Sequence, residues 1–441
     1  MADNKIFETD MGADVPERAV LVCVDTGEND PKEIESSLDE LERLLDTAGG
    51  VAVARMVQSK QNPDVRTYIG SGKLIELSEL CVNEEIDLVV FDDELSPSQI
   101  RNVEDGIDKE IRVIDRSMLI LDIFAKHAVS GEGKLQVELA QLKYTAPRLT
   151  GKGTQLSRLG GGIGTRGPGE SKLESDRRHM HRRIDALEAE IDKIAKNRLT
   201  MRASRDRSGL KKVAIVGYTN AGKSTLLNYL TNAGILSEDK LFATLDTTTR
   251  KFTLPCGEEI LLSDTVGFIR KLPHQLVSAF RSTLDEAVFS DIIVIAVDAS
   301  DEEASEQLKV SESTLEELGA TDKPILYLLN KCDRLESHDS IYPIFEHPDD
   351  TVLVSAKTGE GIDRFIQKLE SIVMQGTSRR SYLIPNAKQK MVNFLYENAS
   401  VEQVEYRADG VFAVAVVDDR VRGIMREYDT DKSLDTSEED W

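Results

Sequence analysis

The chain has 441 residues, with 55 lysines and arginines against 79 aspartates and glutamates, which gives a formal net charge of −24. Hydrophobic residues make up 40% of the chain, which excludes wholesale disorder and predicts several folded domains. Apolar stretches such as Ile292–Val297 fall far short of the roughly 20 residues that a membrane span needs. The N-terminus lacks a signal-peptide pattern, and the four cysteines lack metal-ligand or disulfide spacing. We therefore expect a cytoplasmic protein with reduced thiols.

The charge is distributed unevenly along the chain. Residues 151–212 carry 16 lysines and arginines against 8 aspartates and glutamates, so a basic island lies in an otherwise acidic sequence. The island predicts a polyanionic partner despite the negative total. The acidity of the remainder keeps a surface hydrated in concentrated salt, and it favours a halophilic source over an ordinary acidic protein.

Residues 19–115 alternate β-rich runs with amphipathic stretches. This alternation predicts a small α/β unit with a largely parallel sheet. The expected strands are 19–25, 51–57, 87–92 and 111–115, and the expected helices are about 33–48, 72–85 and 97–105.

A helical hairpin is predicted next. A helical pattern runs from Ser117 to Pro147, and residues 151–169 then hold eight of the 29 glycines, a density that no regular element tolerates. After Met180, an apolar stripe with heptad-like spacing follows. We expect an antiparallel hairpin with a glycine-rich, basic tip; an intermolecular coiled coil is the rival, although about two heptads are short for one. The stripe consists of Ile184, Leu187, Ile191 and Ile194.

The segment KKVAIVGYTNAGKSTLLNYL is typical of a strand, a loop and a helix. Its loop fits the pattern G-x4-G-K-[ST] in full, and such a loop binds a polyphosphate through backbone N–H groups and the helix N-terminus. We expect Lys223 to bridge the outer phosphates and Ser224 to ligate Mg²⁺. The expected nucleotide contacts here are Gly217, Tyr218, Thr219, Asn220, Ala221, Gly222, Lys223, Ser224 and Thr225.

A second motif, Asp264-Thr265-Val266-Gly267, follows the apolar run EILLS. A carboxylate in this position polarises Mg²⁺ through a water molecule, and the N–H of Gly267 can contact the γ-phosphate. Between these two motifs lies the segment expected to form a switch loop, in which the Thr244 hydroxyl would ligate Mg²⁺ and sense the γ-phosphate. Its candidate contacts are Phe242, Ala243, Thr244, Leu245 and Asp246.

The third motif selects the base. Asn330-Lys331-Cys332-Asp333 follows the strand-like run PILYLL, and a carboxylate there accepts hydrogen bonds from guanine N1 and N2. Adenine lacks this donor pair and would leave the carboxylate unpaired. Ser355-Ala356-Lys357 would add a backbone N–H for guanine O6. The motifs, in this order, predict a GTP-binding domain with Lys223, Thr244 and Gly267 as its catalytic residues and Ser224 and Thr244 as its magnesium ligands.

The predicted fold class is α/β. It combines a P-loop GTPase domain with an N-terminal α/β domain bearing the long hairpin and with a small C-terminal α+β domain. In the C-terminal domain we expect a helix at about 386–398 and two strands meeting at Asp409–Gly410. The predicted divisions are a tail (1–18), the α/β subdomain (19–116), the hairpin (117–207), the GTPase domain (208–376), the C-terminal domain (377–428) and an acidic, disordered tail (429–441).

With these motifs in place, the chain resembles the HflX family of translation-factor-class GTPases from about residue 19 to residue 417. The most specific part is residues 131–178, followed by FATLDTTTR and DTVGFIRKLP. The resemblance implies binding to the large (50S) ribosomal subunit and its rRNA, and a role in ribosome dissociation, rescue or biogenesis. It also implies ATP hydrolysis in some members. Thr247 departs from the family, in which proline is common at that position.

Hydrolysis is predicted to be slow without help. Phe268 follows Gly267 where many small GTPases have a glutamine that orients the attacking water. Binding to the ribosome could arrange the switch loops and so orient the attacking water. A potassium ion held by Asn220 is the second candidate, since cation-dependent relatives carry an asparagine there; otherwise Asn220 is a loop residue that bonds backbone groups.

Basic residues surround the expected hairpin tip. We interpret them as phosphate contacts on RNA, against the alternative of a solvated charged hairpin. Two alternative functions remain: a GTPase acting on another RNA or on RNA modification, and a GTP-sensing module that binds protein partners. We expect a monomer. The candidate RNA contacts are Arg148, Lys152, Arg158, Arg166, Lys172, Arg177 and Arg178.

Overall fold

A computed structural model gives the fold, in which the chain divides into two compact units. Unit 1 holds residues 1–191 together with Phe242 and Lys271, and unit 2 holds most of the remainder. None of the described helices is long and apolar enough to span a bilayer. The described residues are 16–28, 30–107, 111–149, 172–206, 210–231, 241–242, 247–271, 281–335 and 348–431.

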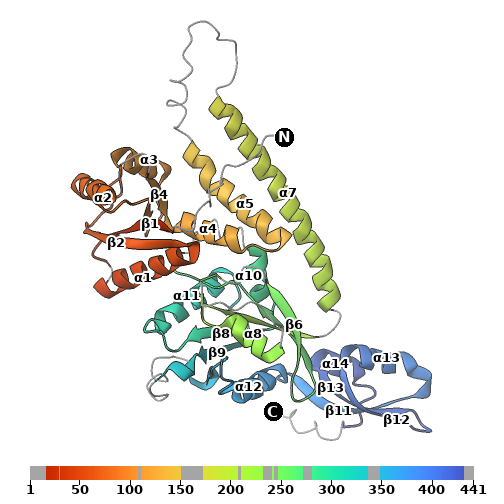
Figure 1. Ribbon diagram of the computed structural model, residues 1–441. Coiled ribbons are helices and arrows are strands. Elements are labelled where there is room, and N and C mark those ends of the chain that lie inside the picture. The colour runs from red at the N-terminus through yellow and green to blue at the C-terminus, as the bar shows by residue number, and fades with distance from the viewer. Residues whose placement is uncertain are drawn as a thin grey trace, which may run out of the picture. The chain divides into compact units, whose positions relative to one another are not determined.

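Unit 1 contains a four-stranded parallel sheet in the order β2-β1-β3-β4, as the alternating pattern predicted. One face packs on α2 and α3 through buried residues such as Val22, Leu77 and Val103. Figure 1 shows α1 on the opposite face. Asp30 and Ser96 form capping boxes that begin α1 and α3. The bounds are β1 (Glu17–Asp25), α1 (Pro31–Ala48), β2 (Gly50–Ser59), α2 (Ser71–Asn83), β3 (Leu88–Phe91), α3 (Pro97–Gly106) and β4 (Arg112–Asp115).

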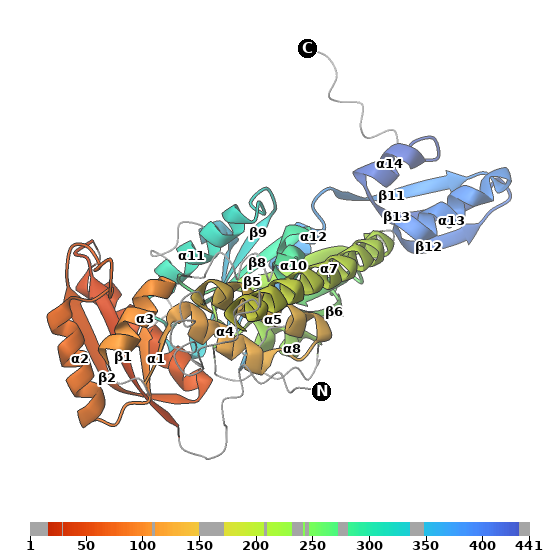
Figure 2. The same cartoon turned by 90° about the horizontal axis from the view of Figure 1, so that it is seen from above.

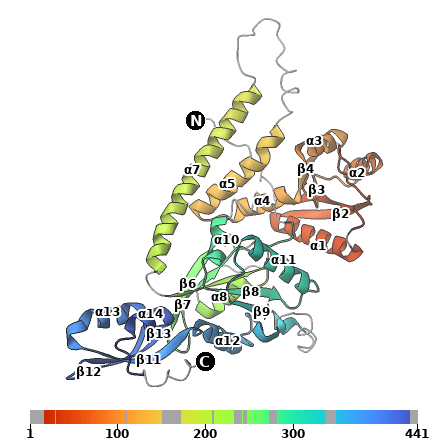
Figure 3. The ribbon, with the colours of Figure 1, turned by 180° about the vertical axis from the view of Figure 1, so that it is seen from behind.

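The helical hairpin follows the sheet. The long helical pattern expected between Ser117 and Pro147 is interrupted, because Ser130 caps a new helix through its Oγ, which accepts the N–H of Gly133 at 2.8 Å. Apolar side chains of α5 and α7, including Leu139 and Leu187, then pack together as the heptad-like stripe predicted. Figures 1 and 3 show these two helices side by side. The bounds are α4 (Arg116–His127), α5 (Gly131–Thr145), η1 (Ala146–Leu149) and α7 (Lys172–Asp206).

Unit 2 contains a six-stranded sheet in the order β10-β9-β8-β5-β7-β6, in which β6 alone is antiparallel among the described strands. The apolar central strands and the inner faces of α8 and α12 form its core. The carboxyl ends of the parallel strands meet at one edge, where α/β sheets bind their ligands. The bounds are β5 (Lys211–Gly217), α8 (Lys223–Thr231), β6 (Thr248–Thr253), β7 (Glu259–Asp264), α10 (Arg281–Val288), β8 (Ile292–Asp298), α11 (Ala304–Glu317), β9 (Ile325–Asn330), η3 (Cys332–Arg334), η6 (Pro348–Asp350), β10 (Thr351–Leu353) and α12 (Ile362–Val373).

The C-terminal part of unit 2 is an antiparallel sheet in the order β11-β13-β12, with α13 and α14 supplying the rest of its core (Figure 2). The predicted helix and hairpin are present, whereas β11 and α14 were not predicted. The first residues of the expected disordered tail are instead bonded to β11: Thr430 donates its N–H to the Ser381 carbonyl, and Asp431 accepts the Ser381 N–H. Residues 432–441 of that tail lie outside the described residues. The bounds are β11 (Thr377–Ile384), η7 (Asn386–Lys388), α13 (Gln389–Asn398), β12 (Ser400–Tyr406), β13 (Val411–Asp418) and α14 (Asp419–Met425).

Candidate functional site

The phosphate loop connects the buried strand β5 to the start of α8. Gly217 and Gly222 both have positive φ angles, of 139° and 88°. A Cβ at Gly217 would lie 2.1 Å from the carbonyl oxygen of Ala296, and one at Gly222 would lie 2.1 Å from Nδ2 of Asn330. Both positions therefore require glycine. The loop packs too tightly against β8 and β9 for any other residue.

Lys223 is buried beneath the loop. Its ammonium donates to the carbonyls of Gly217 at 3.1 Å and Tyr218 at 2.7 Å, and its side chain is only 6% exposed. Burial lowers the pKa of Lys223 to about 8, although nearby Asp264 opposes the shift. A buried cation with a lowered pKa is stabilised by an incoming anion, so this lysine is suited to bind phosphate.

Ser224 and Asp264 meet below the start of α8. The Ser224 hydroxyl donates to Oδ2 of Asp264 at 2.6 Å. Asp264 is fully buried, and its Oδ1 has no hydrogen-bond partner among the described residues. Burial raises the pKa of Asp264, against the opposing effects of Lys223 and Ser224. A buried, unsatisfied carboxylate oxygen beside a hydroxyl is the hard oxygen donor set that Mg²⁺ prefers, so these residues fit that ion.

The segment after Asp264 lies directly on the phosphate loop. A Cβ at Gly267 would lie 2.8 Å from the Cα of Thr219, so this position also needs glycine. Phe268 donates its N–H to the Gly217 carbonyl at 3.0 Å, and its carbonyl accepts the Thr219 N–H at 2.8 Å. The Phe268 side chain is 1% exposed and apolar, so it cannot orient an attacking water.

The side chains of the two residues between Asp264 and Gly267 are directed into the protein core. The Thr265 hydroxyl donates to the Ile215 carbonyl at 2.9 Å, and Val266 is buried. Their expected nucleotide contacts are therefore confined to the backbone. Thr225, the remaining expected contact in the loop segment, lies half-buried in the first turn of α8.

Asn330 joins the phosphate loop to the turns that are expected to bind the base. Its Nδ2 donates to the Ala221 carbonyl at 2.8 Å, and its Oδ1 accepts the Ala356 N–H at 2.9 Å. Its side chain is 2% exposed, and its amide thus connects the backbones of Ala221 and Ala356. Of the N–H groups in the Ser355–Lys357 turn, that of Ala356 is thus already used within the protein.

Asp333 is the residue expected to recognise a guanine. The Ser355 hydroxyl donates to its Oδ1 at 2.7 Å, and this hydrogen bond lowers the pKa of Asp333. The carboxylate therefore stays ionised as an acceptor at neutral pH. Neighbouring Lys331 has a φ of 64° and forms an ion pair with Asp298 at 2.6 Å, which fixes the end of β9.

The candidate switch loop is only partly described. Ala243, Thr244, Leu245 and Asp246 lie outside the described residues, and with them the second predicted magnesium ligand. Phe242 is 2% exposed and packs edge-to-face on Phe124 of α4, with ring centroids 4.6 Å apart. Its side chain is thus a packing contact of unit 1 and not a nucleotide contact.

The predicted RNA contacts fall into three groups. Arg148 is an internal residue: its guanidinium lies 3.0 Å from Oδ2 of Asp115 and 3.4 Å over the Tyr144 ring. It is 17% exposed and already paired, so it is not available for phosphate. Arg177 and Arg178 are exposed on α7. Lys152, Arg158 and Arg166 lie outside the described residues, and nothing is described of the Lys172 side chain.

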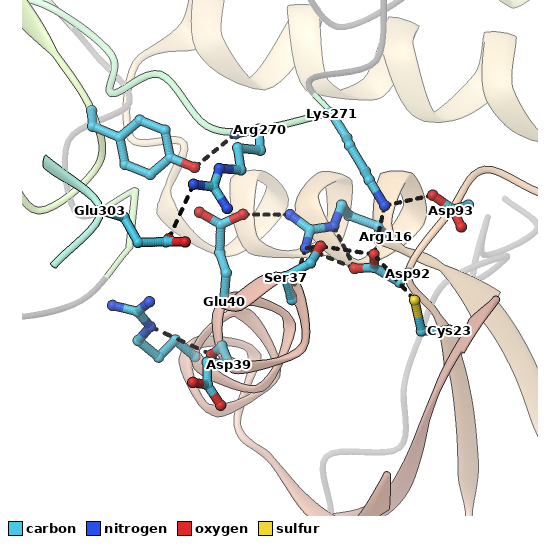
Figure 4. A network of polar contacts seen from close by, with 12 residues as sticks. Cys23, Ser37, Asp39, Glu40, Asp92, Asp93, Arg116, Arg270, Lys271 and Glu303 are labelled. Atoms are coloured by element: carbon cyan, nitrogen blue, oxygen red, sulfur yellow. Dashed lines mark hydrogen bonds and ion pairs between the residues drawn. The ribbon is translucent and has the colours of Figure 1, made fainter. Parts of the chain in front are cut away.

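Sequence reasoning missed two features of the site. The Tyr218 hydroxyl accepts the Arg270 N–H at 2.9 Å, and the Arg270 guanidinium lies 3.1 Å from Glu303. Unit 1 also contains a buried cluster of charges around Arg116 (Figure 4). The sequence does place these charges beside apolar runs. Arg116 lies two residues before the segment MLILDIF, and Asp92 and Asp93 follow the run LVVF.

Comparisons with known proteins show what this chain is similar to. The chain is 48% identical to GTPase HflX of Lacrimispora saccharolytica over 92% of this chain and 94% of that protein. It is 39% identical to GTPase HflX of Escherichia coli over 91% and 94%. A GTP-binding protein of Sulfolobus solfataricus, solved with GDP, is 27% identical, with a TM-score of 0.43 over 81% of this chain and 99% of that one.

Four family profiles match successive parts of the chain. They describe a GTP-binding GTPase N-terminal region (35–125), a GTP-binding GTPase middle region (127–205), a 50S ribosome-binding GTPase (212–331) and an HflX C-terminal domain (343–427). Together with the sequence identity to full-length relatives and the phosphate loop described above, these matches show that the chain belongs to the HflX family of GTPases.

Proposed function

We propose that this protein hydrolyses GTP with Mg²⁺ bound and associates with the large ribosomal subunit. The observation that carries the nucleotide part is the pairing of a buried lysine with a buried carboxylate that has an unsatisfied oxygen. Lys223 would neutralise phosphate, and Ser224 together with Asp264 would hold and polarise the magnesium ion. The ion supplies charge neutralisation on the phosphates during phosphoryl transfer.

Guanine recognition would follow from Asp333. Its ionised carboxylate accepts N1–H and N2–H of guanine, whereas adenine would leave it unpaired. Asn330 would act by holding the Ala221 and Ala356 backbones in place. ATP hydrolysis remains an expectation from the family resemblance alone.

Ribosome binding is supported by the family and by the hairpin. The profile that matches residues 212–331 is named for 50S ribosome binding. In the hairpin, α5 and α7 are locked together by Leu139 and Leu187 and by the Arg183–Glu138 ion pair at 2.7 Å. The exposed pair Arg177 and Arg178 lies near the start of α7, next to the basic segment of the sequence. A rigid support with exposed arginines fits contact with rRNA phosphates.

Co-sedimentation with purified 50S subunits tests the proposal. The full chain should pellet with the subunits in a non-hydrolysable GTP analogue and less in GDP. The double variant Arg177→Glu/Arg178→Glu should pellet less, with nucleotide affinity unchanged. Lys193→Glu/Lys196→Glu makes the same charge change on α7 about 24 Å further along the helix and should behave as the wild type. Equal pelleting of both double variants would reject the hairpin contact, and no pelleting of the wild type would reject ribosome association.

The activator of hydrolysis is a separate question. Because Phe268 cannot orient water, turnover should be slow until 50S subunits arrange the switch segments. Potassium is the second candidate: Asn220, in the phosphate loop, has a φ of 60°. Hydrolysis rates with and without subunits, each in sodium and in potassium at equal ionic strength, separate the two. A rate that responds to neither would contradict both.

A further inference from the structure

A hydroxyl of the phosphate loop is buried without a hydrogen-bond partner. Oγ1 of Thr219 has no partner among the described residues, and the residue is 6% exposed. In the described part of the GTPase motifs, Oδ1 of Asp264 is in the same condition, and that oxygen fits a magnesium ion. A buried polar atom without a partner costs free energy, so native proteins rarely keep one unless a ligand or a function uses it. The Thr219 hydroxyl therefore indicates a bound partner, as Oδ1 of Asp264 does.

Thr219 lies between two residues that are expected at the outer phosphates. On one side, the carbonyl of the preceding residue, Tyr218, accepts a hydrogen bond from the Lys223 ammonium at 2.7 Å. On the other side, Thr219 donates its backbone N–H to the Phe268 carbonyl at 2.8 Å. A Cβ at Gly267 would lie 2.8 Å from Cγ2 of Thr219, so the Thr219 side chain packs directly on Gly267. The hydroxyl shares a carbon atom with that methyl group, and it therefore lies beside the residue expected to contact the γ-phosphate.

The residues after Asp264 offer no side chain that could orient the attacking water. In residues 265–269, all of which are described, Thr265 alone has a polar side chain, and its hydroxyl donates to the Ile215 carbonyl at 2.9 Å. Phe268 is apolar and 1% exposed. A hydroxyl both donates and accepts hydrogen bonds, as the amide of a glutamine does. The hydroxyl of Thr219 can therefore take the task that Phe268 cannot.

We propose that Thr219 is a catalytic residue for GTP hydrolysis: its hydroxyl donates a hydrogen bond to a γ-phosphate oxygen and accepts one from the attacking water. The inference rests on the proposed function and names one of its catalytic groups. It concerns the nucleotide site alone, because Thr219, Gly267 and Phe268 all belong to unit 2.

The hydroxyl contributes orientation and no net proton transfer. In the reaction, the water oxygen forms a bond to the γ-phosphorus while the bond from that phosphorus to the β–γ bridging oxygen breaks. The electron pair of the broken bond leaves with GDP. The water keeps one proton as a hydroxyl of the released phosphate and passes the other to a phosphate oxygen. Thr219 retains its own proton, and its two hydrogen bonds hold the water and the γ-phosphate in line.

Single-turnover hydrolysis of GTP by the full-length chain, with and without 50S subunits, tests this role. Thr219→Val keeps the branched shape and the methyl contact with Gly267 but removes the hydroxyl. Its hydrolysis rate should fall about 10- to 100-fold, the effect of losing one group that orients the reactants. Thr219→Ser keeps the hydroxyl and should hydrolyse GTP at close to the wild-type rate.

Three further measurements on Thr219→Val separate a catalytic role from a structural one. GDP affinity should be unchanged, because GDP has no γ-phosphate. Affinity for GDP with aluminium fluoride, which imitates the phosphoryl group in transfer, should fall by a factor similar to that of the rate. The melting temperature of the nucleotide-free variant should be equal or higher, since the substitution removes an unsatisfied buried hydroxyl. A structural role would instead lower both the melting temperature and the GDP affinity.

Thr231→Val is the matched control. It makes the same chemical change at the end of α8, where the hydroxyl donates to the Leu227 carbonyl at 2.7 Å, and it should leave the hydrolysis rate unchanged.

The outcomes are distinguishable from failure of the proposed function. A wild-type rate in Thr219→Val, or a rate in Thr219→Ser as low as that of Thr219→Val, would overturn the catalytic role and leave GTP hydrolysis standing. Equal losses of affinity for GDP and for GDP with aluminium fluoride would assign the hydroxyl to the fold of the loop and would also overturn the role. If the wild type neither binds nor hydrolyses GTP, the proposed function fails as well.

Discussion

Two carboxylates, Asp92 and Asp264, occupy equivalent places in the two units and differ in how they are satisfied. Each is fully buried at the carboxyl end of a parallel strand. Both oxygens of Asp92 are bonded, one to Arg116 and the other to Ser37 and Lys271. Asp264 is bonded through Oδ2 to Ser224, and its Oδ1 has no partner among the described residues. Burial of a charge alone therefore does not mark a binding site; at Asp264 the unsatisfied oxygen is the additional observation that points to a ligand.

The cations differ in the same way. Burial alone would lower the pKa of Lys271, yet Asp92 and Asp93 raise it overall. Burial does lower the pKa of Lys223, to about 8. The first lysine is paired with two carboxylates, whereas the second donates to two backbone carbonyls and is stabilised further when an anion arrives. The contrast predicts that mutation of the buried Arg116 beside Asp92 affects folding, whereas mutations in the phosphate loop affect binding.

The largest effect is expected at Arg116. Arg116→Met leaves Asp92 and Glu40 buried without the guanidinium, and it should lower the free energy of unfolding by about 3–5 kcal/mol. Chemical denaturation of the nucleotide-free protein measures this. Arg55→Ala breaks exposed ion pairs with Asp39 and Glu42 and should cost less than about 1 kcal/mol. A similar loss in both variants would show that burial of the Arg116 ion pairs adds nothing to stability.

Lys223→Ala should show the reverse pattern. GTP affinity should fall about 100-fold, the effect of losing a charged hydrogen-bond donor to phosphate. The melting temperature of the nucleotide-free protein should be unchanged or higher, because the variant no longer buries an ammonium with a lowered pKa. Calorimetry and a thermal melt measure the two. A lower melting temperature with binding intact would contradict the assignment.

The pKa of Lys223 gives a pH test. Bound triphosphate raises the pKa of this lysine above its free value of about 8, so binding takes up a proton at higher pH. GTP affinity should be constant below pH 8 and should fall up to about tenfold per pH unit above it. Titrations between pH 7 and pH 9 measure the slope. In Lys223→Arg the side chain stays charged, and the slope should vanish.

Asp122 provides the smallest and most local test. It lies on α4 beside Gln141 of α5, and burial raises its pKa to about 6. Because the folded-state pKa exceeds the unfolded one, the charged form destabilises the fold above pH 6, and stability is regained as the pH falls toward 4. Asp122→Asn should therefore stabilise the protein by about 1–2 kcal/mol at pH 8 and by nothing at pH 4. Asp185→Asn, on an exposed face of α7, should show no such difference.

The elements that carry a local pattern could be predicted from the sequence. The parallel strands of both sheets, the glycines of the phosphate loop and the stripe of Ile184 and Leu187 were placed correctly. Strand β11 was missed because its inward residues, Tyr382 and Ile384, follow a polar run with two arginines.

Contacts between distant residues could not be predicted. Asp92 meets Lys271 across 179 positions and Arg116 across 24, and although each of these charges borders an apolar run, the sequence does not say which charges pair. For the same reason Arg148 was assigned to RNA although it pairs with Asp115, and Phe242 was assigned to nucleotide although it packs on Phe124. Residue type and charge indicate what a side chain can do, and long-range packing decides whether it is free to do it.

Asn330 bonds at one end to Ala221 and at the other to Ala356. A single side-chain amide thus connects the loop expected to bind the triphosphate to the turn expected to bind the base. A substitution at Asn330 would therefore displace both the phosphate loop and the base-binding turn. A change in nucleotide preference would need substitutions at other positions, or compensating substitutions at both ends of this amide.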